Sequence, residues 1–230
     1  MSTNLSGNTL TLGSTILDEE HIKEIHKHYY VPDNCTPGTT VILDGIECLC
    51  VATGVTIQGS NLTRIAVDKY HELGYYQKYV GMNIGEATIS KINYWRWGGY
   101  ENTTGNTSQE VGYGLQNTIR CLANTVNYTQ GTTTSTSNVN VPLMWMGVND
   151  FRSSHSDKWF VPSLNELLNY VYPYKSSLTF DTTTGGSTNN YYWSSSEVDS
   201  NSSYMVLFYD GRSGQGGKYN SRPVRLCRAF

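Results

Sequence analysis

The 230-residue sequence predicts an α+β protein, because its strand-like and helix-like segments are grouped rather than alternating. Two strands are predicted early in the chain, two helices follow in its middle, and a loop-rich series of strands extends to the last residue. The length is sufficient for one domain with its own core and an additional N-terminal segment. We therefore divide the chain into residues 1–38, a segment for attachment or oligomerisation, and residues 39–230, the main domain.

The N-terminal segment is predicted to contain one short helix, Asp18–Tyr30. Its acidic residues come early and its Lys and His residues come late, an order that complements the helix dipole. The following stretch, "VPDNCTPG" (residues 31–38), contains two prolines and would end the helix. The next stretch, "TTVILDGIECLCVATG" (residues 39–54), has two apolar runs around Asp44–Gly45, which is a strong hairpin signal.

A helix is predicted over residues 107–126. Thr107 and Glu110 have the spacing of a capping box, in which each side chain bonds the backbone of the other residue. An apolar stripe at helical spacing follows, made of Val111, Leu115, Ile119 and Leu122.

A second helix is predicted over residues 163–172. Ser163 and Glu166 form another capping box, several Leu residues form the apolar face, and Pro173 would end the helix. The polar tracts at residues 129–140 and 182–190 have no apolar periodicity, and we expect them to be loops.

The stretch "YMVLFY" (residues 204–209) alternates as a strand does, yet both of its faces are apolar. We assign every second residue from Tyr204 to the core. Met205, Leu207 and Tyr209 then form a second apolar face, and such a face favours contact with a partner.

A last strand is predicted at Val224–Arg228. We expect it to lie inside a sheet and to pair with the hairpin at Val41–Val51, so that the two ends of the domain meet. The core is expected to include four large apolar side chains, namely Trp159, Leu167, Trp193 and Phe208.

Composition and charge exclude several classes of function. Charged residues make up 15% of the chain, the net charge is −3, and the few basic residues are scattered, which argues against nucleic-acid binding. No run approaches the roughly 18 apolar residues of a membrane helix, so no membrane insertion is expected. The first residues lack the pattern of a signal peptide.

Metal and catalytic sites find little support in the sequence, and we expect no cofactor and no metal. His21, His26 and His28 are not spaced to stack on one helical face. "GVND" (residues 147–150) resembles the Asn-Asp pair of calcium-dependent lectins, but no acidic cluster follows it. His71 and His155 have no nucleophile motif near them that would indicate Ser-His-Asp catalysis.

Five cysteines occur, and we expect them to be free, buried thiols, with a bridge between Cys50 and Cys227 as the alternative. Cys48 and Cys50 are expected to lie on opposite faces of a strand and therefore not to bond each other. The full set is Cys35, Cys48, Cys50, Cys121 and Cys227.

The C-terminal segment has the composition of a recognition surface. From Asn189 to Arg222, 21 of 34 residues are Tyr, Ser, Gly or Asn. Antibody binding loops use the same residues, because Tyr provides rigid amphipathic contact area while Ser, Gly and Asn provide adaptable hydrogen bonds.

Three motifs in this part of the chain resemble a known family. They are "KWFVPSLNELLNYV" (residues 158–171), "YYWSSSE" (191–197) and "FYDGRSGQGGKYNSRPVRLCRAF" (208–230). Together they resemble a C-type-lectin-fold family that is widespread in gut bacteria and their phages and includes many variable proteins of diversity-generating retroelements. The resemblance covers about Thr39 to Phe230. It implies a C-type lectin-like fold whose C-terminal antiparallel sheet presents a binding face.

The resemblance also divides the C-terminal residues into two sets. The fixed framework would be Trp193–Glu197, Tyr204, Val206, Phe208, Gly211, Lys218, Ser221, Arg225 and Arg228–Phe230. The variable, ligand-binding positions would be Val198, Asp199, Asn201, Ser202, Met205, Leu207, Tyr209, Arg212, Gly214, Gly216, Gly217, Tyr219 and Arg222. In this family, mutagenesis at adenines changes Asn codons. That route cannot produce Met205 or Gln215, so either those template codons differ or the chain is a fixed relative.

The resemblance implies a non-enzymatic receptor-binding protein or adhesin, at a phage tail tip or displayed on a bacterial surface. Its partner would be a protein or glycan of a host or target cell surface, and the N-terminal segment would join it to a virion or surface assembly. One alternative is an enzyme similar to formylglycine-generating enzymes, which would need an active-site cysteine pair or metal ligands. The other is a structural subunit whose Tyr-rich face is the interface of a homo-oligomer.

Overall fold

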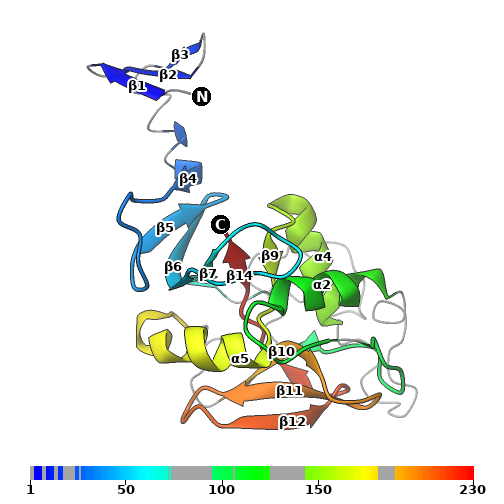
Figure 1. Cartoon of the computed structure of the whole chain (residues 1–230). Coiled ribbons are helices and arrows are strands. Elements are labelled where there is room, and N and C mark those ends of the chain that lie inside the picture. Colours follow the sequence, from blue (N-terminus) through cyan, green and yellow to red (C-terminus); the bar gives the residue numbers. More distant parts are fainter. Residues whose placement is uncertain are drawn as a thin grey trace, which may run out of the picture.

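The computed structural model describes residues 3–6, 9–12, 15–17, 24–25, 27–71, 73, 95–105, 107–124, 143–180 and 190–230. Strands and helices both occur among them, and the predicted α+β class is confirmed (Figure 1). The largest sheet is antiparallel, with the strand order β4 (Tyr29–Tyr30), β5 (Thr40–Leu43), β6 (Ile46–Thr53), β7 (Arg64–Asp68), β14 (Cys227–Ala229) and β9 (Trp159–Phe160).

Three smaller sheets accompany it. The C-terminal sheet consists of β10 (Tyr191–Glu197), β11 (Ser202–Leu207) and β12 (Ser213–Gly217), in that order, and a short ribbon pairs β8 (Trp95–Arg96) with β13 (Ser221–Arg222). Near the N-terminus, β1 (Thr3–Ser6), β2 (Thr9–Leu12) and β3 (Thr15–Leu17) form a sheet that Figure 1 draws apart from the largest one.

The helices lie between and beside these sheets. They are α2 (Gly114–Ala123), α4 (Met144–Ser154) and α5 (Leu164–Glu166), and α5 continues as the π-helix η2 (Leu167–Val171) and the 3-10 helix η3 (Tyr172–Ser177). The segment from α5 to η3 lies between β6 and the C-terminal sheet and contacts both (Figure 1). It therefore joins the two largest sheets into one domain.

The predicted hairpin is confirmed. β5 and β6 pair with Leu43 opposite Ile46, and the two residues between them, Asp44 and Gly45, have positive φ angles of 54° and 78°. Two consecutive left-handed residues define the turn that best matches the twist of a two-residue hairpin.

The last strand does not pair with the hairpin, contrary to the prediction from the sequence. β14 pairs with β7 on one side and β9 on the other, and β7 separates it from the hairpin. The interior position in a sheet is confirmed. The prediction missed β7, which supplies Ala66 and Val67 opposite Arg228 and Cys227.

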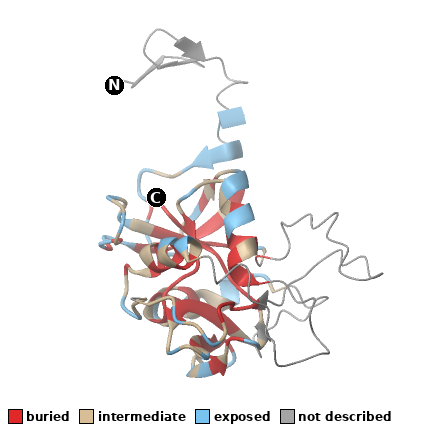
Figure 2. Cartoon of the chain, turned by 90° about the vertical axis from the view of Figure 1, so that its right-hand side faces the viewer, coloured by how far each residue is buried: buried red, intermediate tan, exposed pale blue. Residues whose placement is uncertain are grey.

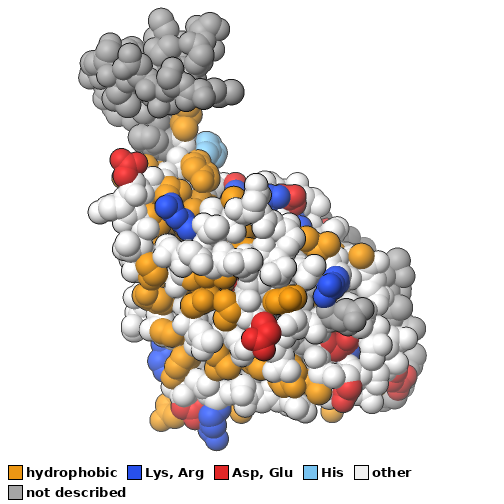
Figure 3. Space-filling model, in the orientation of Figure 1, with side chains coloured by type: hydrophobic (Ala, Val, Ile, Leu, Met, Phe, Trp, Pro, Cys, Tyr) orange, Lys and Arg blue, Asp and Glu red, His pale blue; other side chains and the backbone are white. Residues whose placement is uncertain are grey.

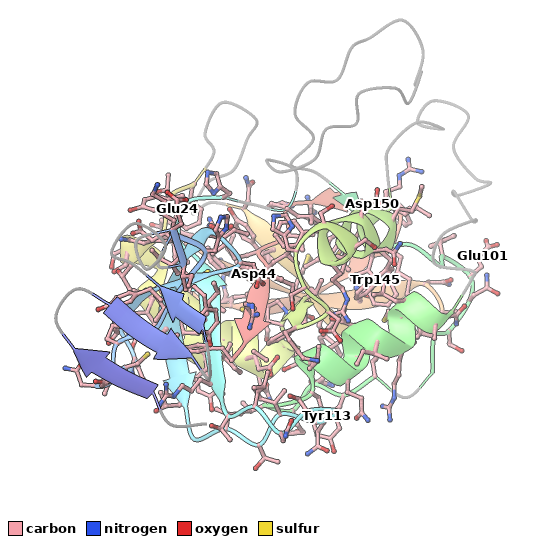
Figure 4. All side chains as sticks on the ribbon, turned by 90° about the horizontal axis from the view of Figure 1, so that it is seen from above. Glu24, Asp44, Glu101, Tyr113, Trp145 and Asp150 are labelled. Atoms are coloured by element: carbon pink, nitrogen blue, oxygen red, sulfur yellow. The ribbon has the colours of Figure 1, made fainter. Side chains whose placement is uncertain are left out.

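A side-chain ion pair nevertheless connects the hairpin turn to β14. The Asp44 carboxylate accepts hydrogen bonds from Arg228 Nε at 2.7 Å and from Trp159 Nε1 at 2.8 Å. Figure 4 shows Asp44 above the C-terminal strand. Burial tends to raise the pKa of Asp44, but the bonds from Arg228 and Trp159 outweigh it and leave the pKa below its usual value. The two ends of the domain meet through this pair.

The first predicted helix begins later than its sequence pattern suggested. α2 starts at Gly114, because Gly112 has a left-handed φ of 87° that interrupts any helix beginning near Thr107. The predicted capping box is therefore wrong, and the Thr107 hydroxyl instead accepts a hydrogen bond from the Glu197 amide. Of the expected stripe, Leu115 is buried, whereas Ile119 is 44% exposed.

The second predicted helix is confirmed at its start. Ser163 Oγ accepts from the Glu166 amide, and the Glu166 carboxylate accepts from the Ser163 amide at 2.7 Å, which completes the capping box. Pro173 does not end the helical path, because it lies in η3, where the chain has changed to 3-10 geometry.

α4 was not predicted. It contains "GVND", so residues 147–150 form part of a helix rather than a calcium-binding loop. Trp145 is fully buried, and its ring packs edge-on against Trp97 at 5.2 Å. Figure 4 shows Asp150 and Trp145 on this helix.

The N-terminal helix prediction holds only in part. Residues 24, 25, 27 and 28 are helical, but Tyr29 and Tyr30 form β4 and pair with Leu43 and Ile42. Residues 18–23 and 26, and the expected loops at 129–140 and 182–189, lie outside the described residues.

Two buried clusters form the core (Figure 2). All four predicted core residues are confirmed: Trp159 and Trp193 lie in the first cluster, Leu167 and Phe208 in the second, and none is exposed. All five cysteines are buried and free, as expected. Cys48 and Cys50 pack in the same cluster, so the expected opposite placement is wrong, because residues two apart on a strand share a face.

Candidate ligand-binding site

The C-terminal sheet is packed on both of its faces. Met205 on β11 lies opposite Trp193 on β10 and belongs with it to the first cluster, whereas Val206 belongs to the second. Met205 is 7% and Leu207 9% exposed, so the expectation that both are exposed contact residues is wrong. A strand buried on both faces has a continuous apolar sequence. This burial explains why both faces of "YMVLFY" are apolar.

The glycines of the edge strand β12 provide room for the side chains beneath them. A Cβ atom at Gly216 would lie 3.0 Å from Met205 Cε and Sδ and 3.1 Å from a Trp193 ring carbon. A Cβ atom at Gly214 would lie 3.4 Å from the Tyr191 ring. Gly216 is therefore required for packing, whereas Gly214 is partly exposed and has more space.

One end of the C-terminal sheet is the turn between β11 and β12. Tyr209 is 65% exposed there, and Arg212 Nε forms an ion pair with Asp210 at 2.7 Å. Lys175 of η3 holds the turn by donating to the carbonyl oxygen of Tyr209 at 2.7 Å. Gly211, with a φ of 79°, lies against the Tyr172 ring. This turn is attached to the helical segment and presents one exposed aromatic ring.

The opposite end combines two aromatic side chains from distant parts of the sequence. Tyr219 is 48% exposed and packs edge-on against the Tyr100 ring, with 5.4 Å between the ring centroids. The Tyr219 ring also lies over Gly217, where a Cβ atom would be 2.5 Å from it. The β10–β11 turn is adjacent, because the Lys218 amide donates to the Asn201 carbonyl oxygen at 2.8 Å.

A buried ion pair fixes the loop that carries Tyr100. Lys218 Nζ bonds the Glu197 carboxylate and donates to the Asn102 carbonyl oxygen at 2.8 Å, while Glu197 also accepts from the Thr104 and Gly105 amides. The two charged side chains are 0% and 6% exposed. Burial lowers the pKa of Lys218, although the carboxylate of Glu197 opposes this shift. These bonds join the loop at residues 97–105 to the C-terminal sheet.

Tyr100 was missed by the sequence interpretation, which considered only the last part of the chain. The signal that could have identified it is "WGGYENTTG" (residues 97–105), a polar, Gly-rich stretch that carries Tyr100 three residues after the buried Trp97. Such a composition is typical of a surface loop and resembles that of the C-terminal recognition segment.

The thirteen predicted contact positions differ in exposure. Asp199, Asn201, Tyr209, Arg212 and Tyr219 are exposed, Val198, Ser202, Gly214, Gly217 and Arg222 are partly exposed, and Met205, Leu207 and Gly216 are buried. The expected single surface is divided, because Tyr209 and Tyr219 lie at opposite ends of β12. At about 3.3 Å per residue, the strand separates the two ends by roughly 15 Å.

Other groups that could perform chemistry are buried in the core. Burial raises the pKa of the Cys48, Cys121 and Cys227 thiols, which disfavours the nucleophilic thiolate. Within the described part of the chain, no three His, Cys, Asp or Glu side chains are placed to hold a metal ion. His21 and His26 lie outside that part, and His28 is exposed.

Glu166 carries a carboxyl group that is fully buried between α5 and α2. Burial raises its pKa to about 7, although its carboxylate accepts hydrogen bonds from the Ser163 and Gly112 amides. Its Oε2 atom also lies close to Gly114, where a Cβ atom would be only 2.1 Å away. This packing makes Glu166 a connector between α5 and the start of α2.

The fold and the site define an α+β protein whose exposed aromatic side chains occupy both ends of its C-terminal sheet. Compared with known proteins, the chain matches no protein-family model, and no curated protein matches it significantly. Among the described helices, none combines the length and the hydropathy needed to cross a membrane.

Proposed function

We propose that the chain is a non-enzymatic binding protein that recognises a surface ligand through the Tyr219–Tyr100 end of its C-terminal sheet. The observation that carries this proposal is the pair of tyrosine rings, one of them 48% exposed, on a loop and on the turn after β12, which a buried ion pair joins. A tyrosine side chain offers a large contact area and loses little conformational entropy on binding. A loop that is already held in place reduces the entropy cost of ordering the binding surface.

We further propose that residues 39–230 form a C-type lectin-like domain of the retroelement-associated family. The three sequence motifs support this assignment. The position of β14 inside the sheet that contains the β5–β6 hairpin, with the Asp44–Arg228 pair between them, is compatible with it. The chain would then be a receptor-binding protein or adhesin of a phage tail tip or bacterial surface.

Sequence diversification, if it operates on this chain, would act on the exposed positions. Asp199, Asn201 and Tyr219 can change without disturbing a core contact, because their side chains are exposed. Met205 and Gly216 pack against each other and against Trp193, so changes there would alter the framework. In the family pattern Met205 and Gly216 would be variable positions, so the variable surface proposed here contains fewer residues than that pattern.

The N-terminal segment is the proposed attachment point to a larger assembly. Ile25, Tyr29 and Tyr30 are between 42% and 47% exposed, and Tyr29 and Tyr30 form an edge strand of the largest sheet. Figure 3 shows hydrophobic side chains beside a histidine at this neck of the molecule. Exposed apolar groups next to an edge strand favour contact with another chain.

A cell-binding assay tests the proposed function. Fluorescently labelled protein is incubated with a panel of gut bacterial strains, and binding is measured by flow cytometry. Against any strain that binds the wild type, we expect Tyr219→Ala and Tyr100→Ala to weaken binding roughly tenfold or more, because aromatic residues dominate such interfaces.

Two comparisons make the assay specific. Tyr70→Ala is the matched control, since Tyr70 is 40% exposed but follows β7 on the largest sheet. Tyr209→Ala reports on the other end of the C-terminal sheet. If Tyr219→Ala and Tyr100→Ala bind as the wild type does and Tyr209→Ala loses binding, the binding site lies at the Tyr209 end of the sheet instead.

A further inference from the structure

Arg222 of β13 differs from Arg212 and Arg228 in its bonding. Its guanidinium lies 5.9 Å from the centre of the Tyr191 ring, and among the described residues it makes no hydrogen bond and no ion pair. Its Nε atom is inaccessible to solvent and has no partner. Arg212 and Arg228, by contrast, form ion pairs with Asp210 and Asp44.

The surroundings hold Arg222 in place without neutralising it. Its backbone pairs with Trp95 in the β8–β13 ribbon, and the Tyr191 ring supports the guanidinium from below. The acidic side chain at the adjacent β11–β12 turn, Asp210, already pairs with Arg212 at 2.7 Å, and at the far end of the sheet Glu197 bonds Lys218. Among the described residues, the Arg222 guanidinium therefore has no acidic partner.

The chemistry of a guanidinium indicates what would bind there. Its terminal N–H groups form a planar fork that matches a carboxylate, and such charge-assisted hydrogen bonds are among the strongest in proteins. A partly buried guanidinium with a desolvated Nε and no acceptor is unfavourable by itself. An arriving carboxylate would supply the missing acceptor.

The atoms beside Arg222 favour a sugar as the carrier of that carboxylate. The partly buried Tyr191 ring and the side-chain-free backbone at Gly214 form a small apolar ledge, since the ring lies 3.4 Å from the position of a Gly214 Cβ atom. A pyranose ring has an apolar C–H face that packs on an aromatic surface, while its substituents remain available for polar contacts.

We propose that Arg222, Tyr191 and Gly214 form a subsite for an acidic sugar of a cell-surface glycan, with the carboxylate bound by the Arg222 guanidinium. This inference rests on the proposed function and names the class of its ligand. It assigns the charge recognition to Arg222 and leaves the Tyr219–Tyr100 pair as a second contact region at the other end of the C-terminal sheet.

The test compares acidic oligosaccharides with their neutral counterparts. Oligosaccharides ending in glucuronic acid or sialic acid are immobilised, alongside the same compounds in which the carboxyl group has been reduced to an alcohol. Binding of the full chain is measured by biolayer interferometry. We expect the wild type to bind an acidic form about tenfold more tightly than its reduced form, the range of one charge-assisted hydrogen-bonding interaction.

Three variants complete the test. Arg222→Gln should remove the preference for the acidic form, and Arg222→Lys should retain part of it, because Lys keeps the charge without the fork. Arg212→Gln is the matched control and should keep the full preference, since the exposed Arg212 guanidinium is already paired with Asp210. Thermal unfolding of each variant verifies that it is folded.

The outcomes separate this inference from the proposed function. Equal binding of acidic and reduced sugars by the wild type, or no binding of either, would overturn the acidic-sugar subsite without any mutant. Retention of the preference by Arg222→Gln would also overturn it. Because cell binding by the wild type and its loss in Tyr219→Ala are measured independently, the proposed function can stand while this subsite fails.

Discussion

Replacing Lys218 with methionine removes the positive charge of the buried ion pair and keeps most of the volume of the side chain. Glu197, 6% exposed, would then keep its hydrogen bonds from the Thr104 and Gly105 amides but lose its ion pair with Lys218. Removing one member of a buried pair typically costs about 3–5 kcal/mol, since it leaves an uncompensated charge. The bond to the Asn102 carbonyl oxygen, about 1 kcal/mol, is lost as well.

Because the amide donors to Glu197 remain, we expect the lower part of this range, about 3–4 kcal/mol of unfolding free energy. The assay is urea denaturation followed by tryptophan fluorescence, with thermal unfolding in parallel. For a domain of this size the melting temperature should fall by about 10 °C. The loop carrying Tyr100 would also lose its anchor, so binding of target cells should weaken even below the melting transition.

Two further variants decide whether the ion pair is responsible. Lys158→Met removes an exposed lysine paired with Asp157, and it should change stability by less than about 0.5 kcal/mol. The double variant Lys218→Met/Glu197→Gln should recover part of the lost stability, since no unpaired charge remains. A loss below about 1 kcal/mol in Lys218→Met would refute the reasoning, because it would mean that the pair is hydrated in solution.

Two further predictions concern the core. Trp193→Ala should destabilise the protein by roughly 3–5 kcal/mol in the same denaturation assay, because Trp193 is fully buried, and an unchanged midpoint would contradict its place in the core. Glu166 has a folded-state pKa raised to about 7, so the folded state binds its proton more tightly than the unfolded state does. Its contribution to stability should be present at low pH and be lost as the pH rises from about 4.5 to 7, by on the order of 3 kcal/mol. Across this pH range the free energy of unfolding should decrease less for Glu166→Gln than for the wild type. If it decreases equally in both proteins, Glu166 is not the cause of the pH dependence of stability.

The sequence predicted those features that depend on neighbouring residues. Asp44–Gly45 defines its own hairpin, and the Ser163–Glu166 capping box starts its own helix, because both signals act within four residues. α4 could also have been predicted from the sequence, because Met144, Val148 and Phe151 have helical spacing and are all buried. No capping signal marks its start.

Features set by distant contacts could not be predicted from the sequence. The burial of Met205 depends on Trp193 and on the cluster that covers that face of the sheet, and a strand sequence alone does not show whether its second face meets solvent, a partner or more core. The same limit applies to Tyr100, which lies beside Tyr219 only because Lys218 and Glu197 hold its loop. Tertiary packing decides such cases.

The position of β14 has a consequence for the kinetics of folding. Val67 of β7 pairs with Cys227, roughly 160 positions further along the sequence. The centre of the largest sheet therefore forms only when a long loop is closed, and loop closure costs conformational entropy. Proteins dominated by such distant pairings fold slowly. Until residues 227–229 arrive, β7 and β9 each present an unpaired edge to other chains. Production of this protein should therefore depend on conditions during synthesis, with low temperature and chaperones reducing aggregation of the incomplete sheet.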